Sequence, residues 1–193
     1  MSRLATSFVL GYHGCDAATA DAVVNYRERL GASSNDYDWL GPGTYFWESD
    51  PFRAEEWALE KQQAGRYSKA AVIGAVIDLG NCLDLMSAEN LKLLSEMYKE
   101  FRKTLRKTGI SNLPRNFSPK GKRKNDKLFR KLDCAVISYL HENEVFDSVR
   151  GLFIEGRPAF PGSGIMQKTH IQIAVVNPDC IKGVFHWPYP AQA

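Results

Sequence analysis

Paired cysteines are missing from this sequence. Its four cysteines stand far apart, at positions 15, 82, 134 and 180, and form no CxxC motif, and the chain has only four histidines. Structural zinc sites need Cys and His ligands at short, characteristic spacings, so we expect no bound metal. Unpaired thiols are typical of a reducing compartment, and we therefore expect a cytoplasmic protein.

Long apolar runs are also missing. No stretch approaches the ~18 apolar residues of a membrane span. The amino terminus has no basic region followed by an apolar one, so we expect no signal peptide and no membrane partner. Of the 193 residues, 44% are hydrophobic and 24% charged, which fits one soluble domain covering residues 1–193.

Acidic residues are nearly absent from one segment. Residues 101–131 hold 12 of the 25 basic residues and a single acid, Asp126, although the net charge of the chain is only +3. We interpret residues 99–131 as a basic insertion of helix and loop.

Three roles remain open for this basic insertion. It is a solvated surface, a surface for an acidic protein such as an antitoxin, or a contact for nucleic acid phosphates. We favour nucleic acid, with Lys122, Arg123 and Lys124 as contacts, because a flexible basic loop can follow a single strand without reading its bases.

The hydrophobic pattern predicts an α+β fold. β-branched and aromatic runs favour strands, and apolar residues three or four positions apart favour helices. The predicted strands cover residues 7–13, 44–47, 70–79, 148–156, 169–177 and 181–187. The predicted helices cover residues 17–30, 51–65, 87–107 and 126–141, with Asp16 capping the first.

A histidine stands at the end of the first predicted strand. In VLGYHGCD, an apolar run ends at Tyr12 and is followed directly by His13, Gly14 and Cys15. Such a histidine is a packed core residue, a metal ligand, a catalytic base or a group that holds a ligand. The dispersed cysteines and histidines speak against a metal.

Three further stretches follow in order along the chain. GPGTYFWES covers residues 41–49, IGAVIDLGNCLDL covers 73–85, and FDSVRG at 146–151 is followed by HIQIAVVN at 170–177. Together with YHG at 12–14, they resemble the catalytic domain of ADP-ribosyltransferases of the diphtheria-toxin and poly(ADP-ribose) polymerase type. The resemblance runs from about residue 7 to 185 and is poor over residues 86–145.

The resemblance implies a split, mixed β-sheet core flanked by helices, with NAD as co-substrate and a histidine-tyrosine-glutamate triad on three strands. It assigns His13 to the adenine-side ribose, the Gly14 backbone to the nicotinamide amide, and Tyr45 to stacking on the nicotinamide ring. A second stacking aromatic is expected from the following helix, where we favour Trp57 over Phe52. Cys15 and Gly43 are assigned to the same pocket.

The third triad position departs from the family pattern, because Gln172 stands where the glutamate is expected. A glutamine still hydrogen-bonds ribose hydroxyls but offers no negative charge to an oxocarbenium-like transition state. This favours transfer of a single ADP-ribose over polymer formation. Glu155 and Asp147 are the nearest acids in sequence that can compensate, and strand order alone places neither in the pocket.

His170 lies two residues before Gln172, on the same side of the predicted strand. In related toxins this position helps select the acceptor. His170 is therefore predicted to recognise the acceptor or remove its proton. The loop at 156–168 corresponds to the target-recognition loop of the family.

The predicted function is a mono-ADP-ribosyltransferase that moves ADP-ribose from NAD to RNA or DNA, as a bacterial toxin or phage-defence effector. Three alternatives stay open. The enzyme modifies protein side chains, or the chain is a catalytically weak module that binds NAD or ADP-ribose, or it is a nucleic-acid-binding protein with a vestigial pocket.

Overall fold

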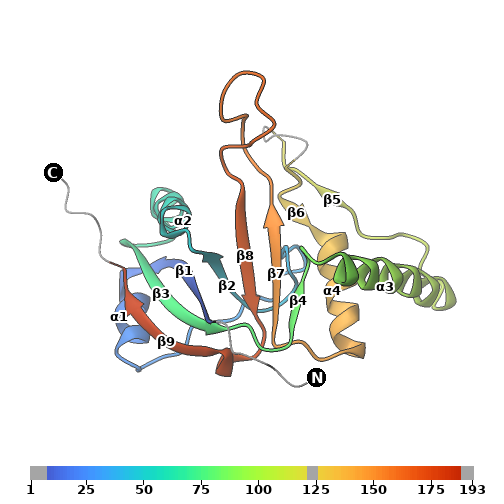
Figure 1. Ribbon diagram of the computed structural model, residues 1–193, viewed down its shortest axis with the longest axis horizontal. Coiled ribbons are helices and arrows are strands. Elements are labelled where there is room, and N and C mark those ends of the chain that lie inside the picture. Colours follow the sequence, from blue (N-terminus) through green and yellow to red (C-terminus); the bar gives the residue numbers. More distant parts are fainter. Residues whose placement is uncertain (1–7, 121–125, 188–193) are drawn as a thin grey trace.

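A seven-stranded, mostly antiparallel sheet forms the centre of the molecule (Figure 1). The computed structural model describes residues 8–120 and 126–187. The strand order is β4-β7-β8-β2-β1-β3-β9, and only the β4–β7 pair is parallel. The α+β class predicted from the sequence is thus confirmed. The strands are β1 (Phe8–Asp16), β2 (Thr44–Glu48), β3 (Ala70–Asp78), β4 (Cys82–Asp84), β7 (Ser148–Phe153), β8 (His170–Val175) and β9 (Ile181–His186).

The sheet opens between β1 and β2. β1 pairs with β3 along its whole length, from Phe8 to Asp16, but it pairs with β2 only at Gly11 and Tyr12. Beyond Tyr12 the two strands separate. Two half-sheets, β4-β7-β8-β2 and β1-β3-β9, therefore diverge just where the sequence places His13.

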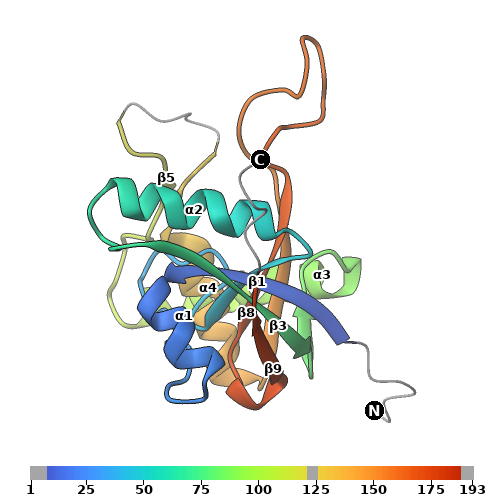
Figure 2. The ribbon, with the colours of Figure 1, turned by 90° about the vertical axis from the view of Figure 1, so that its left-hand side faces the viewer.

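Helices cover the half-sheets on different sides. α1 (Ala17–Val24) and α2 (Pro51–Gln63) lie on opposite faces of β1-β3-β9 (Figure 2). α3 (Ala88–Lys107) and α4 (Lys131–Asn143) lie over the other half-sheet, where the core includes Leu83, Val149 and Ala174. A short 3₁₀ helix, η1 (Pro178–Cys180), leads into β9.

Helix starts follow local capping chemistry. The Asp16 side chain accepts a hydrogen bond from the N–H of Ala18, which confirms the predicted cap of α1. Asp50 caps α2 in the same way, through the N–H of Arg53, and Pro51 occupies the first turn.

Two predicted helix boundaries are wrong. α1 ends at Val24 rather than at residue 30, because the chain turns at Tyr26, whose φ is 57°. α4 begins at Lys131 rather than at Asp126. Asn116 provides the reason, since its Oδ1 accepts from the N–H groups of Leu132 and Asp133 and so caps α4 from a distant segment.

The basic insertion contains a small hairpin that the sequence pattern did not predict. β5 (Asn116–Phe117) pairs with β6 (Phe129–Arg130), and the rings of Phe117 and Phe129 stack with centroids 5.1 Å apart. The sequence between them is polar and basic, and a two-residue ladder is too short to give a hydrophobic period. β4 was not predicted either, because its three residues are also too few to show a period.

Candidate functional site

A cavity of about 780 Å³ lies where β1 and β2 separate. Its volume falls within the ~300–1,000 Å³ that is usual for ligand sites. Side chains from β1, β2, α2, β8 and the basic insertion line it. The three predicted triad residues, His13, Tyr45 and Gln172, all line this cavity, each from a different strand.

His13 bridges the two half-sheets at the point where their backbone pairing stops. Its Nδ1 lies 2.7 Å from the carbonyl oxygen of Tyr45. A carbonyl only accepts, so Nδ1 carries the proton and Nε2 of the neutral ring is left as an acceptor. Burial lowers the pKa of His13, opposed by this hydrogen bond, and the neutral ring is therefore favoured.

Tyr45 and Trp57 give the cavity aromatic walls. The Tyr45 hydroxyl donates to the Gly41 carbonyl oxygen at 2.7 Å and accepts from the Leu40 N–H at 2.8 Å, so its ring is held in place by the preceding turn. Burial raises the pKa of this phenol far above its usual value. Trp57 lines the cavity from α2, whereas Phe52 is 65% exposed and does not.

Gln172 lies in the middle of the sheet, opposite Trp47 on β2 and Gly151 on β7. Alternate residues of a strand face the same side, so Gln172 shares its face with Tyr45 and Trp47 across the ladder. The amide therefore reaches the cavity from a rigid central strand.

Gly14 shows two separate features. A Cβ at this position would lie 2.3 Å from the carbonyl oxygen of Ala54, so the close approach of α2 requires glycine. The carbonyl of Leu10 accepts from Ser49 beside β2, and that of Val72, opposite Gly14, accepts from Trp187 on the far side. Because peptide groups alternate sides along a strand, the N–H and C=O of Gly14 point away from β3, toward the side where β2 lies. Gly14 itself is not among the residues that line the cavity.

Cys15 and Gly43 do not line the cavity. Cys15 is buried against α1, and burial raises the pKa of its thiol to about 11. Gly43 exchanges two backbone hydrogen bonds with Ser33, and a Cβ there would lie 3.0 Å from the carbonyl oxygen of Val175. Both residues support the walls of the site from behind.

His170 is placed differently from the prediction. It shares its strand with Gln172, but its side chain is fully buried, near the rings of Trp39, Phe153 and Trp47, and does not line the cavity. Its Nδ1 donates to the carbonyl oxygen of Lys168 at 2.7 Å. Burial lowers its pKa.

Glu155 lines the cavity, although the sequence alone did not place it there. It is 8% exposed and lines the cavity just beyond the end of β7, whereas Asp147 is hydrogen-bonded to Asn81 and Asn177 and does not line it. Nη2 of Arg53 lies 3.6 Å from its carboxylate. The register of the β7–β8 ladder, which the sequence does not reveal, decides between the two acids.

Arg150 is tied into an ion-pair cluster away from this cavity. Its guanidinium donates to both carboxylate oxygens of Glu48, at 2.5 and 2.7 Å, and to Asp84 at 3.0 Å. These bonds raise the pKa of Arg150 above its usual value. The guanidinium of Arg150 is therefore held by carboxylates of β2 and β4 and is not a free surface charge.

The described part of the basic insertion reaches the cavity. Pro119, Asp126, Leu128 and Phe129 line it, and the Phe129 ring meets that of Tyr37 edge-on at 4.9 Å. Lys122, Arg123 and Lys124 lie outside the described residues. The insertion thus borders the same opening that holds the predicted triad.

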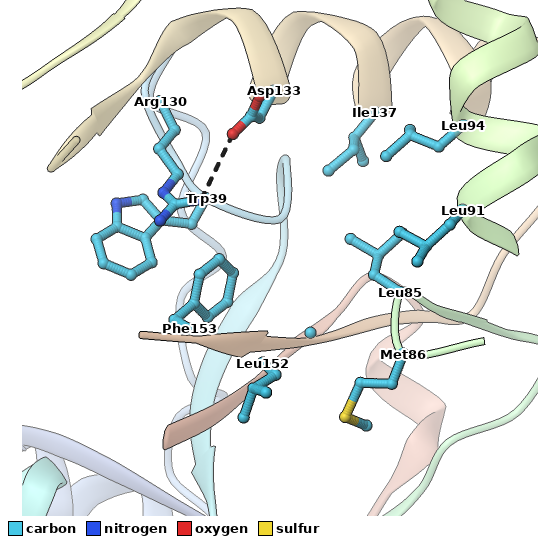
Figure 3. Close-up of a pocket in the computed structure, with 11 residues that line it drawn as sticks. Trp39, Leu85, Met86, Leu91, Leu94, Arg130, Asp133, Ile137, Leu152 and Phe153 are labelled. Atoms are coloured by element: carbon cyan, nitrogen blue, oxygen red, sulfur yellow. Dashed lines mark ion pairs between the residues drawn. The ribbon is translucent and has the colours of Figure 1, made fainter. Parts of the chain in front are cut away.

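A second cavity, of about 540 Å³, lies between α3, α4 and the β4–β7 edge (Figure 3). Its lining is mostly aliphatic, including Leu85, Leu91, Leu94 and Ile137. The polar part is one ion pair between Arg130 and Asp133, and the Arg130 guanidinium also lies over the ring of Trp39. It contains none of the predicted site residues.

The described residues, 8–120 and 126–187, hold no group of three or more His, Cys, Asp or Glu side chains that suits a metal ion. Within the same ranges, none of the helices has the length and apolarity needed to cross a membrane.

Comparisons with known proteins find one distant relative. An uncharacterised protein of Methanocaldococcus jannaschii is 29% identical over 89% of this chain and 83% of its own length. No protein-family model matches the chain, and no solved structure matches it. Because the relative is itself uncharacterised, the functional argument depends on the cavity between the half-sheets.

Proposed function

We propose that this protein is a mono-ADP-ribosyltransferase that uses NAD as the ADP-ribose donor. The observation that supports this proposal is that His13, Tyr45 and Gln172, on three different strands, line one cavity at the opening of a split sheet. This is the arrangement implied by the resemblance to the diphtheria-toxin and poly(ADP-ribose) polymerase type of transferase.

The orientation of each group suits one part of NAD. The free Nε2 of His13 is an acceptor for a ribose hydroxyl. The peptide edge of Gly14 offers an N–H and a C=O together, which match the carboxamide of nicotinamide. The Tyr45 and Trp57 rings provide flat apolar surfaces for the pyridinium ring, and such stacking contributes ~0.5–1.5 kcal/mol beyond burial.

Gln172 explains why a single transfer is expected. Cleavage of the bond between nicotinamide and ribose develops positive charge at the anomeric carbon, as in glycoside hydrolysis. The amide of Gln172 can orient the ribose hydroxyls but adds no negative charge. The chain therefore relies mainly on orientation of the two substrates, which is itself a large catalytic effect.

Nucleic acid is the acceptor that we favour. The basic insertion borders the cavity through Pro119, Leu128 and Phe129, and the exposed ring of Phe117 stacks on Phe129. Aromatic rings next to basic residues bind single strands by base stacking and phosphate contact. A role as a toxin or phage-defence effector is part of the proposal.

A binding module is the second proposal, and Gln172 favours it. In this case the cavity holds NAD or ADP-ribose without breaking the glycosidic bond. The neutral amide in place of a carboxylate is the specific observation, because charge-assisted hydrogen bonds are roughly twice as strong as neutral ones.

Labelled NAD tests both proposals. The protein is incubated with NAD labelled in the adenylate part, together with total RNA, single-stranded DNA or lysate protein. Label that enters nuclease-sensitive material supports nucleic acid transfer, and label that enters only protein contradicts the acceptor. Binding of NAD by calorimetry without label in any acceptor supports the binding module.

The variant that tests the site is His13→Ala, with Phe52→Ala as control. Loss of the His13 acceptor is expected to weaken NAD binding at least ~10-fold, the equivalent of one charge-neutral hydrogen bond with its buried partner left unpaired. Phe52 is exposed on the same half of the molecule, and its variant is expected to bind NAD normally. Equal NAD affinity of His13→Ala and the wild type would contradict the proposed site.

A further inference from the structure

We infer that Glu155 is the base that accepts the proton of the acceptor group. This role rests on the proposed transfer reaction. It concerns the attack of the acceptor on the ribose, a step for which His13, Tyr45 and Gln172 provide no base. The sequence indicated His170 as the group that removes this proton, but its side chain is buried behind the cavity wall. The side chain of Glu155, in contrast, lines the cavity.

The position of Glu155 along the ladder separates its role from that of Gln172. Gly151 lies opposite Gln172 and Phe153 lies opposite His170, and the carbonyl of Glu155 accepts from the N–H of Lys168. Glu155 is thus four residues beyond the Gln172 level on the same face, an offset of ~13 Å at ~3.3 Å per residue. The buried side chains of Phe153 and His170 lie at the level between them on this face. Gln172 and Glu155 are therefore too far apart to hold the same ribose hydroxyls, and each meets the cavity at its own place.

The ion pair with Arg53 does not fully occupy Glu155. Arg53 makes a closer ion pair with Glu56, and Glu56 in turn accepts from Lys168. Within residues 8–120 and 126–187, the closest cation to the Glu155 carboxylate is Arg53, at 3.6 Å. The carboxylate therefore keeps acceptor capacity toward the cavity.

Two side chains of the cavity wall also have buried N–H groups without a hydrogen-bond partner. Among the described residues, Nε1 of Trp47 and Nε of Arg53 are buried, have no hydrogen-bond partner and belong to side chains that line the cavity. Trp47 is 7% exposed and lines the same cavity. Buried donors in folded proteins are nearly always satisfied, so the unpaired N–H groups of Trp47 and Arg53 mark a polar part of this wall.

The electrostatic surroundings suit a base that works near neutral pH. Burial raises the pKa of Glu155, opposed chiefly by Arg53. The other ionisable groups around it come from two segments of the chain, Asp126 and Arg130 from one and Lys168 and His170 from the other. A carboxylate whose pKa lies closer to the working pH is a more effective proton acceptor.

The transfer step then balances. The bond between the ribose anomeric carbon and the nicotinamide nitrogen breaks, and its electron pair leaves with neutral nicotinamide. A lone pair on the acceptor nitrogen or oxygen forms the new bond to the anomeric carbon. The proton of that N–H or O–H passes to the carboxylate of Glu155 and from there to water.

The test compares Glu155→Gln, Glu155→Asp and the control Glu144→Gln, which changes an exposed acid after α4. Three readouts are needed: NAD affinity by calorimetry, nicotinamide release without an acceptor, and transfer of label from NAD to RNA, single-stranded DNA or lysate protein. Glu155→Gln is expected to bind NAD within ~2-fold of the wild type and to lose ~10²–10⁴-fold in transfer rate, as for other general bases. Glu155→Asp keeps the acid and is expected to be intermediate.

The pH profile distinguishes a base from a structural residue. The wild-type transfer rate should fall as pH decreases through the raised pKa of Glu155, because the protonated acid accepts no proton. This acid limb should persist in Glu155→Asp and disappear in Glu155→Gln. Transfer by Glu155→Gln at the wild-type rate, with the acid limb intact, overturns this inference alone. A wild type that neither binds nor cleaves NAD overturns the proposed function, and this inference with it.

Discussion

The two cavities described above are lined by different kinds of side chain. The cavity between the half-sheets is lined by His13, Gln172 and Glu155 together with four aromatic rings of β2, α2 and the segment that follows α2. The cavity under α3 is lined mostly by aliphatic side chains, and its charges are paired with each other. Both cavities include aromatic rings and charged side chains, and Trp39 lines both, but the first has the larger set of polar side chains, among them His13, Glu155 and Gln172.

Loose packing of α3 explains the mostly aliphatic cavity beneath it. α3 has no fully buried residue, although its apolar side faces α4 and the sheet edge, and Leu91 remains 49% exposed. A helix that packs loosely leaves space beneath it, and that space is apolar because core side chains surround it. The cavity between β1 and β2, in contrast, lies where these strands stop pairing with each other, while β1 remains paired with β3 and β2 with β8.

The largest expected effect is a loss of stability in Ile137→Ala without a loss of NAD affinity. Ile137 is 1% exposed and lines the apolar cavity, so Ile137→Ala is expected to lower the free energy of unfolding by ~2–5 kcal/mol. NAD affinity of the folded variant should stay within ~3-fold, since additivity holds for separate sites. Urea unfolding and calorimetry measure the two quantities.

Leu91→Ala is the matched control in the same cavity. Because Leu91 is half exposed, we expect a loss below ~1 kcal/mol. A large loss of NAD affinity in Ile137→Ala, without loss of fold, would break the distinction between the two cavities.

The second prediction distinguishes the role of the Tyr45 hydroxyl in stability from the role of its ring in NAD binding. Tyr45→Phe leaves the Leu40 N–H and the Gly41 C=O without their partner, so the free energy of unfolding should fall by ~1–3 kcal/mol. The ring remains, so NAD affinity is expected to stay within ~3-fold, whereas Tyr45→Ala should lose it. If Tyr45→Phe also loses NAD affinity at full stability, then the hydroxyl rather than the ring makes the contact.

The smallest effect concerns pH. Burial lowers the pKa of His13 and His170 below the usual 6.5. Folding therefore favours the neutral rings, and the stability they contribute is present above pH ~6.5 and is lost as pH falls toward their folded pKa values. Urea unfolding between pH 7.5 and 5.5 should show this decrease.

The control for the pH prediction is a comparison of slopes. Glu155 has a raised pKa and acts with the opposite sign, since its contribution is lost as pH rises through the folded value. The variant His13→Gln with His170→Gln keeps that opposing contribution and should have a shallower decrease than the wild type. An identical slope in the two proteins would mean that the histidines are not linked to folding.

The local sequence was sufficient for most elements. The alternation and apolar runs of residues 70–79 and 169–177 correctly predicted β3 and β8, and side-chain capping at Asp16 correctly predicted the start of α1. These features depend on contacts within a few residues. The prediction for the start of α4 was wrong because its cap, Asn116, comes from another segment.

Some features of the candidate site could likewise be predicted from the sequence, and others could not. The resemblance carried by YHG, TYF and the Gln172 strand indicated three residues, and all three line one cavity. Trp57 was preferred over Phe52 by sequence, and burial agrees with that choice. The role of Gly14 as the contact point for α2 was invisible, because it depends on how closely a helix approaches.

The sequence alone indicated most of the strands and helices, the order of the motifs and the concentration of basic residues at 101–131. Through the resemblance, it also indicated His13, Tyr45 and Gln172 as candidate site residues. The tertiary structure decided that β1 and β2 separate after Tyr12, that Glu155 lies in the cavity, and that His170 does not. Local propensity acts over a few residues, whereas these decisions depend on ladder register and helix approach between segments far apart in the chain.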